Sequence, residues 1–197
     1  MSVAHSKRPP GRPRDPRLDA AILAAAERQL RERGYGGMSL ESIAGAAGTT
    51  VPALRRRYRG KASLAQAVVD SLRIEALPEG TGASPRDRAL AVLENMRLNL
   101  EREHSMALLG TLLAEESRNP ELLERFRTRL VATRRERLAD AVRSGVAAGE
   151  LPPDADVDML VSMLIGSFYA RYISDGRLPR SWPQRALFQV WPPPRTG

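Results

Sequence analysis

Residues 39–61 read SLESIAGAAGTTVPALRRRYRGK, a sequence that encodes two short helices joined by a tight turn. Ser39 is a favourable N-cap for the first helix, and Thr50 can cap the second. Between them, Gly48 supplies the backbone freedom that a sharp turn at a helix C-terminus requires. The pattern predicts a helix-turn-helix unit over residues 39–58.

The two faces of this unit differ in chemistry. One face is apolar and should form a small core, with Met38, Ile43, Ala46, Ala47, Val51, Leu54 and Tyr58. The outward face carries Thr49, Pro52, Ala53, Arg55, Arg56, Arg57 and Arg59. Such a cationic helix face suits the phosphates and guanine edges of a DNA major groove. A solvated basic helix in an unrelated bundle is the alternative interpretation.

The segment from Ile43 to Leu64 resembles the helix-turn-helix of the tetracycline-repressor (TetR/AcrR) family. Most positions match the family pattern, and the departures are Thr49, Thr50, Arg55, Arg57 and Tyr58. The resemblance implies that phosphates are contacted by Thr50, Arg55, Arg57 and Lys61. It places Val51, Pro52, Ala53 and Arg56 nearest the bases. It also implies that an aromatic residue, here Tyr35, packs beneath the helix-turn-helix.

The charge of the chain is concentrated at its start. The 197 residues carry a net charge of +8. Residues 1–64 contain 13 Lys or Arg against 5 Asp or Glu, so the remainder is neutral. This polarity predicts one nucleic-acid-binding end and one end with a different role.

The first 14 residues, MSVAHSKRPPGRPR, lack apolar periodicity, and we expect a disordered basic arm. The run from Gly11 to Arg14 resembles the core of an AT-hook, in which Arg12 and Arg14 would enter a narrow minor groove. A solvated tail is the alternative.

Helical periodicity continues along the rest of the chain. We expect a first helix from Asp15 to Gly34 with Leu18, Ile22, Ala25, Ala26, Gln29 and Leu30 on its inner face. A fourth helix should run from about Lys61 to Leu77, and residues 78–85 should form a linker. Further helices are expected over 85–100, 106–113, 120–149, 154–175 and 182–191. The sequence therefore predicts an all-α protein of about nine helices, with a DNA-binding domain over residues 15–77 and a second domain over 78–197.

Residues 115–172 resemble the C-terminal domain of AcrR-like regulators, which usually serves dimerisation and ligand sensing. Ser162, Gly166 and Ala170 recur every four residues and leave a shallow strip that another helix can approach. This strip is either a homodimer seam, which the resemblance favours, or a packing surface within one subunit.

An effector cavity in the second domain has several candidate lining residues. Apolar ones are Met96, Met106, Phe126, Met163, Phe168 and Tyr169, and polar ones are Asn99 and His104. For each of them, plain core packing is the alternative.

Catalysis is not indicated. The chain has no Cys and only 2 His, neither in a metal-binding pattern, and it contains no phosphate-binding loop. We expect neither metal nor cofactor, and with no apolar run of about 18 residues we expect a cytoplasmic protein that does not contact a membrane.

These features predict a transcriptional regulator, not an enzyme. The regulator would bind double-stranded DNA at an inverted repeat as a homodimer and respond to a small molecule, more often by release than by engagement. The alternatives are an architectural DNA-binding protein without an effector and, remotely, an enzyme.

Overall fold

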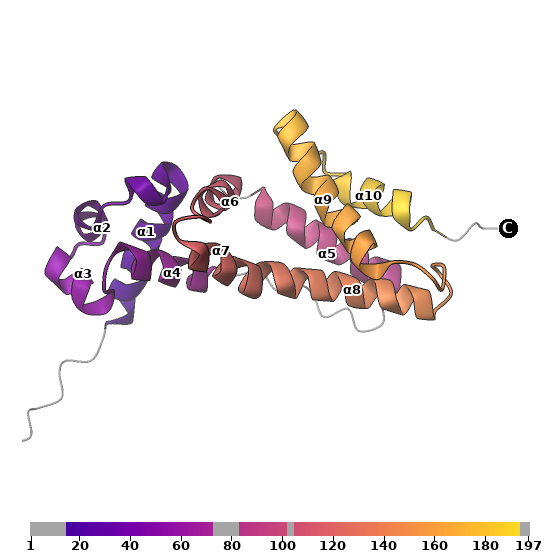
Figure 1. Ribbon diagram of the computed structural model, residues 1–197, viewed down its shortest axis with the longest axis horizontal. Helices are drawn as coiled ribbons and strands as arrows, with labels where there is room; N and C mark the ends of the chain where they lie inside the picture. The colour runs from indigo at the N-terminus through magenta and orange to yellow at the C-terminus, as the bar shows by residue number, and fades with distance from the viewer. Residues whose placement is uncertain (1–14, 73–82, 102–104, 194–197) are drawn as a thin grey trace, which may run out of the picture.

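The computed structural model describes residues 15–72, 83–101 and 105–193, which form helices and connecting turns (Figure 1). The predicted all-α fold is confirmed, and no strand occurs in these ranges. Arg12 and Arg14 of the arm and His104 of the cavity prediction lie outside the described residues.

The N-terminal end of the molecule contains α1 (Pro16–Gly37), α2 (Leu40–Ala46), α3 (Val51–Arg57) and α4 (Lys61–Ser71). The buried side of α1 consists of Ile22, Ala25, Ala26, Gln29 and Leu30, as predicted. Gly34 has a φ of 68°, which interrupts the helical backbone at the position where the first helix was expected to end.

The fourth helix is shorter than predicted. It ends at Ser71, and Leu72 is already non-helical, so the expected end at Leu77 is wrong. The Ser71 hydroxyl donates to the carbonyl of Val68 at 2.7 Å, and the amide of Leu72 bonds back to the same turn. These bonds satisfy terminal carbonyl groups and close the helix early.

The second part of the chain is built from longer helices. They are α5 (Pro85–Leu100), α6 (Ser105–Ala114), α7 (Pro120–Phe126), η1 (Arg127–Val131), α8 (Ala132–Ala147), α9 (Val157–Asp175) and α10 (Trp182–Val190). Helix α5 packs against α8, and α9 and α10 cover the same end of the molecule (Figure 1). The predicted caps Ser84 and Asp156 accept hydrogen bonds from the amides of Asp87 and Met159 at 3.1 and 3.0 Å.

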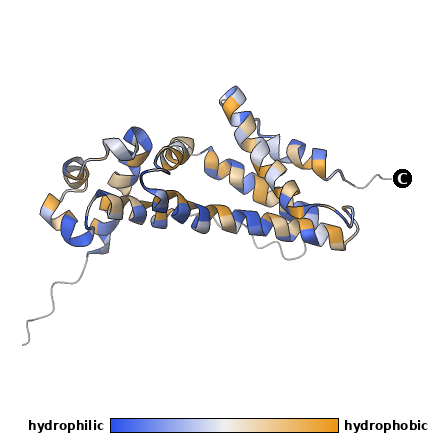
Figure 2. Ribbon diagram, viewed as in Figure 1, coloured by the Kyte–Doolittle hydropathy of each residue, from blue (hydrophilic) through white to orange (hydrophobic). Residues whose placement is uncertain are grey.

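The seventh predicted helix, residues 120–149, is a continuous rod that contains a π-helical turn. Helices α7 and α8 meet through η1, so the rod is not α-helical throughout (Figure 1). Hydrophilic and hydrophobic residues alternate along it (Figure 2). The wider π-helical turn begins directly after Phe126.

Two hydrophobic cores lie along the molecule. The first combines α1 to α4 with Leu108 and Leu112 of α6 and Leu122 and Leu123 of α7. The second lies among α5, α8, α9 and α10. Because α6 and α7 contribute to the first core, the two ends are joined by three helices and not only by α4.

The residue that follows α10, Trp191, holds this helix against the second core. Trp191 is buried against Gly145, and a Cβ at that glycine would lie 2.3 Å from Trp191 Cζ2. Arg86 Nε donates to the Trp191 carbonyl at 3.0 Å. Only glycine leaves enough room for the indole at this helix crossing.

Candidate nucleic-acid interface and effector cavity

The turn between α2 and α3 has the predicted geometry. Ser39 Oγ accepts from the amide of Ser42 at 3.3 Å, and Thr50 Oγ1 accepts from the amide of Ala53 at 3.4 Å. Gly48 has a φ of 64°. Both caps satisfy orphan amides of the first helical turn, as the local sequence predicts.

The inner side of this unit is packed against α1. Ile43 and Leu54 are fully buried, while Val51 and Tyr58 are partly buried against the same core. Gln29 adds a polar link, because its Nε2 donates to Ser42 Oγ at 2.7 Å and its Oε1 accepts from the amide of Ser39 at 3.0 Å. The sequence indicates that Gln29 faces inward but does not reveal this bridge.

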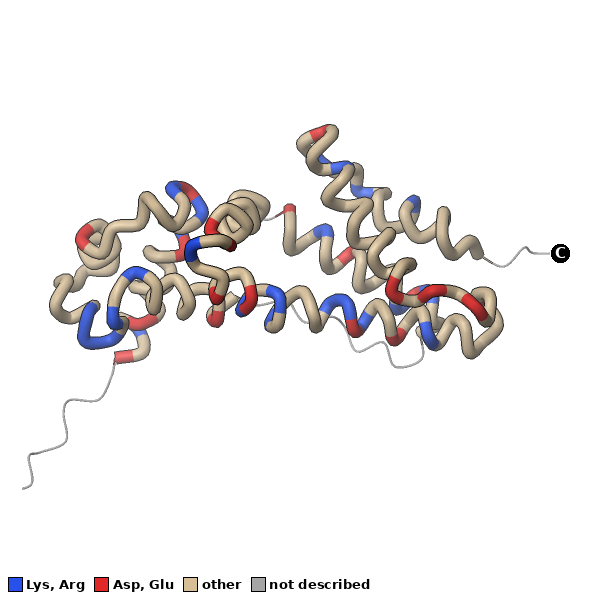
Figure 3. Tube along the Cα trace, in the orientation of Figure 1, with Lys and Arg blue, Asp and Glu red and all other residues tan. Residues whose placement is uncertain are grey.

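The outer side of α3 is exposed and cationic. Arg55, Arg56 and Arg59 are exposed together with Thr50 and Pro52, whereas Thr49, Val51 and Ala53 are half-buried. Figure 3 shows basic residues gathered at α3, at the end of the molecule far from α10. This surface has the charge and the protruding helix that major-groove binding requires.

An acidic side chain lies next to this surface. Hydrogen bonds to the Glu41 carboxylate from its own backbone amide and from Ser39, with the charge of Arg55, hold the pKa of Glu41 below its usual value. The carboxylate therefore stays ionised beside this cationic surface.

Two of the predicted phosphate contacts are engaged within the protein. Arg57 Nε donates to Asp19 Oδ1 at 2.7 Å, which ties α3 to α1. Lys61 Nζ donates to the Gly36 carbonyl at 2.8 Å and lies 4.7 Å from the centre of the Tyr35 ring. Arg57 thus holds α3 against α1 in the free protein, and the phosphate contacts of Arg57 and Lys61 stay predictions.

Comparison with known proteins places these features in a family. Residues 22–68 match the model of the bacterial regulatory proteins of the tetR family, and residues 78–190 match the tetracyclin repressor-like C-terminal domain. The chain belongs to the TetR family of transcriptional regulators. TetR-family proteins of this kind bind DNA through the helix-turn-helix, which here is α2 and α3.

Relatives of this TetR-family regulator match over most of their length. The HTH-type transcriptional regulator YdeS of Bacillus subtilis is 27% identical over 167 residues, which cover 84% of this chain and 83% of YdeS. The HTH-type transcriptional regulator Mb1581 of Mycobacterium bovis is 29% identical over 181 residues, which cover 89% of this chain and 88% of Mb1581.

Solved structures share the fold. MexZ of Pseudomonas aeruginosa, a repressor responsible for antibiotic resistance, superposes with a TM-score of 0.73 at 24% identity, over 91% of this chain and 98% of MexZ. FadR of B. subtilis, solved with stearoyl-CoA, gives a TM-score of 0.70 at 18% identity over 89% of this chain and 99% of FadR. At these identities the likeness concerns the fold.

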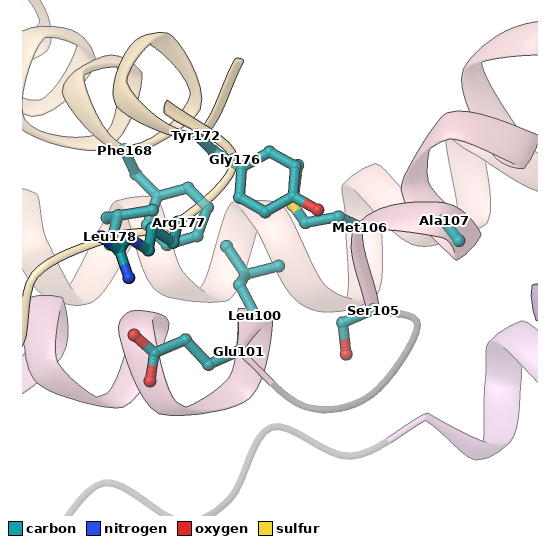
Figure 4. Close-up of a pocket in the computed structure, with 10 residues that line it drawn as sticks. All are labelled: Leu100, Glu101, Ser105, Met106, Ala107, Phe168, Tyr172, Gly176, Arg177 and Leu178. Atoms are coloured by element: carbon teal, nitrogen blue, oxygen red, sulfur yellow. The ribbon is translucent and has the colours of Figure 1, made fainter. Parts of the chain in front are cut away.

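The C-terminal part of the TetR-family regulator contains a cavity of about 610 Å³. It lies between the end of α5, the start of α6 and the end of α9, as Figure 4 shows. The lining residues are Leu100, Glu101, Ser105, Met106, Ala107, Phe168, Tyr172, Gly176, Arg177 and Leu178. Met106 and Phe168 were predicted to line an effector cavity, and the structure brings these two together.

Other predicted lining residues lie elsewhere. Phe126 packs against the N-terminal core, and Met163 is 52% exposed on the outer side of α9, so neither lines this cavity. Met96 is fully buried in the second core. The side-chain amide of Asn99 donates through Nδ2 to Asn95, one turn earlier in α5. Tyr169 packs edge-on against Phe168, with ring centroids 5.4 Å apart.

The predicted seam lies on the outer side of α9. Gly166 and Ala170 are exposed, and Ser162 is half-buried, where its hydroxyl accepts from Arg135 Nη2 at 3.2 Å. Exposed apolar side chains flank the strip on the same helix: Met159, Met163 and Ile173. A face of this composition is unusual for a helix that remains solvated.

Two kinds of feature are absent from the described residues. None of the helices in the described ranges has the length and hydrophobicity needed to span a membrane. Within the same part of the chain, no three acidic or His side chains converge where a metal ion could be held.

Proposed function

We propose that this regulator is a homodimeric repressor that binds an inverted-repeat operator and releases it when a small molecule occupies the C-terminal part. The proposal depends on one observation above all. Helix α6 borders the cavity at one end and packs against α1 of the DNA-binding part along its length. A ligand that shifts α6 therefore changes the position of the reading helix.

The contacts of α6 define this connection. Ser105 and Met106 line the cavity, whereas Leu108 and Leu112 are buried in the N-terminal core. Thr111 Oγ1 donates to the Leu30 carbonyl of α1 at 3.4 Å. The cavity and the DNA-binding part thus share α6, a helix of ten residues. Movement of α6 as a unit would couple the two sites.

Dimerisation supplies the second half-site. A two-fold dimer must hold its reading helices about 34–36 Å apart to enter successive major grooves. The exposed strip of α9, with Gly166 and Ala170 between larger apolar side chains, is the surface that a second copy would cover. Phe188 of α10 is a further exposed apolar side chain at this end of the molecule.

An architectural DNA-binding protein without an effector is the second candidate. The exposed arginines of α3 are equally consistent with that function, but the cavity is not needed for it. The titration of operator fragments with and without candidate small molecules separates the two candidates. An effector should change operator affinity by about 5- to 150-fold, corresponding to a coupling of about 1–3 kcal/mol.

Reciprocity makes this experiment stricter. Operator DNA must change the affinity for the effector by the same factor by which the effector changes the affinity for DNA. Phe168→Ala should alter the effector response and leave operator binding without effector within a few fold. A ligand that fills the cavity and leaves operator affinity unmoved would reject the repressor proposal in favour of the architectural one.

A further inference from the structure

A charged residue interrupts the inward stripe of the long rod. Phe126, Leu130, Leu138 and Val142 are spaced by multiples of four and turn toward the protein interior. The missing member of the series is Arg134, in the first turn of α8. Arg134 is only 8% exposed, so its side chain is buried like its apolar neighbours.

The guanidinium of Arg134 lacks a protein partner. Its Nε is fully buried and makes no hydrogen bond, and no carboxylate in the described residues forms an ion pair with it. The adjacent Arg135 shows the contrast, because it pairs with Asp158 and also donates to Ser162. Arg134 Nε is one of two unpartnered, fully buried side-chain atoms in the described residues.

The other buried arginine of this part is fully compensated. Arg97 of α5 is 6% exposed and is held by Glu94 and Glu101, three residues before it and four after it. Two carboxylates therefore balance one guanidinium. The two arginines have the same burial but opposite electrostatic surroundings, which makes Arg97 a matched internal control for Arg134.

Tyr169 interacts electrostatically with Arg134 but cannot supply the missing charge. Burial raises the pKa of its phenol, which is therefore neutral near pH 7. Burial lowers the pKa of Arg134, but a guanidinium stays protonated in proteins. A neutral phenol and an unpaired cation together present hydrogen-bond donors for an anion.

An unpaired buried cation is costly, and native proteins compensate such groups. The planar fork of a guanidinium matches a carboxylate or a phosphate, with which it forms paired hydrogen bonds. The buried neighbours of Arg134 along the rod, Leu130, Leu138 and Val142, are all apolar. We propose that Arg134 and Tyr169 form the receptor for the acidic group of an organic anion, a carboxylate or phosphate carried on an apolar body.

The identification of this anion as the effector rests on the proposed function, whereas the anion site itself does not. Three probes of similar shape separate charge from shape: benzoate, phenyl phosphate and neutral benzamide. The thermal unfolding midpoint (Tm) of the full-length protein is measured with each probe, at ionic strength matched with sodium chloride. Ligands that bind only the folded state raise Tm with concentration.

The expected result has two parts. Without a probe, Arg134→Met should leave Tm unchanged or raise it, because it removes an uncompensated charge, whereas Arg97→Met should lower Tm by leaving two carboxylates unpaired. With a probe, benzoate or phenyl phosphate should raise the Tm of the wild-type protein, benzamide should not, and the shift should disappear in Arg134→Met. The better of the two anions identifies the acidic group as carboxylate or phosphate.

If Arg134→Met folds poorly, Arg134→Lys provides a second test. This variant retains the charge and should therefore retain part of the anion-induced Tm shift. The site is refuted if neither anion shifts Tm, if benzamide stabilises as well as benzoate, or if the anion shift survives in Arg134→Met. If the anion binds through Arg134 and operator affinity stays constant, the receptor stands and the effector proposal fails.

Discussion

At the scale of single residues, neighbouring arginines of α3 have different roles because their partners differ. Arg56 is exposed on the outer side of the helix, whereas Arg57 turns back to Asp19 of α1. Sequence spacing alone groups both with the cations of the DNA surface. The ion pair depends on α1, more than thirty residues away in sequence, and local pattern cannot reveal it.

Arg56→Ala and Arg57→Ala should therefore affect different measurements. Loss of Arg56 should weaken operator binding by about 1–3 kcal/mol and relax specificity, with little change in stability. Loss of Arg57 should lower the free energy of unfolding by about 0.5–1 kcal/mol, because the pair with Asp19 is partly exposed. Asp19→Asn is the matched control and should destabilise similarly; an unaltered stability in both would contradict the positioning role.

Gly145 offers a steric test of the second core. Gly145→Ala would place a methyl group against the Trp191 ring, and we expect a loss of about 1–3 kcal/mol in urea unfolding. Gly110→Ala in α6 is the control, because no atom lies within 4 Å of its Cβ position. That variant should gain about 0.5–1 kcal/mol from helix propensity. Equal effects of the two substitutions would show that Trp191 does not pack as described.

At the scale of elements, the caps and turns follow from local sequence, and the register of long helices does not. Ser39, Thr50 and Asp156 all act as caps, because a cap needs only an oxygen and a nearby amide. The helical periodicity of residues 120–149 did not reveal the π-helical turn η1. Local pattern likewise does not reveal that Arg134 lies buried within an apolar stripe.

The outer face of α9 also belongs to this scale. Met163→Glu would place a charge in the proposed seam, so the dimer dissociation constant should rise at least about tenfold, about 1.4 kcal/mol. Arg137→Glu, exposed on α8, is the charge control and should leave assembly unchanged. Sedimentation of both variants checks this result, and a Met163→Glu protein that assembles like the wild type would place the seam elsewhere.

At the scale of the whole molecule, the cores determine how the ends communicate. The sequence predicted a basic DNA-binding end and a neutral second domain. The structure adds α6 and α7 to the N-terminal core, and their contacts include Arg125 with Asp70 at 3.0 Å and Gln66 with Glu121 at 2.6 Å. These contacts join segments more than fifty residues apart, so periodicity within a single helix cannot predict them.

The central claim is that two chains read one inverted repeat through α3. Selection of bound fragments from the source genome, followed by measurement of the number of chains per fragment, tests it most directly. The account predicts a shared inverted repeat, two chains on each site, half-site centres about 34–36 Å apart, and loss of selection in Arg56→Ala. Fragments without a common repeat, bound with equal affinity by wild type and variant, would contradict it.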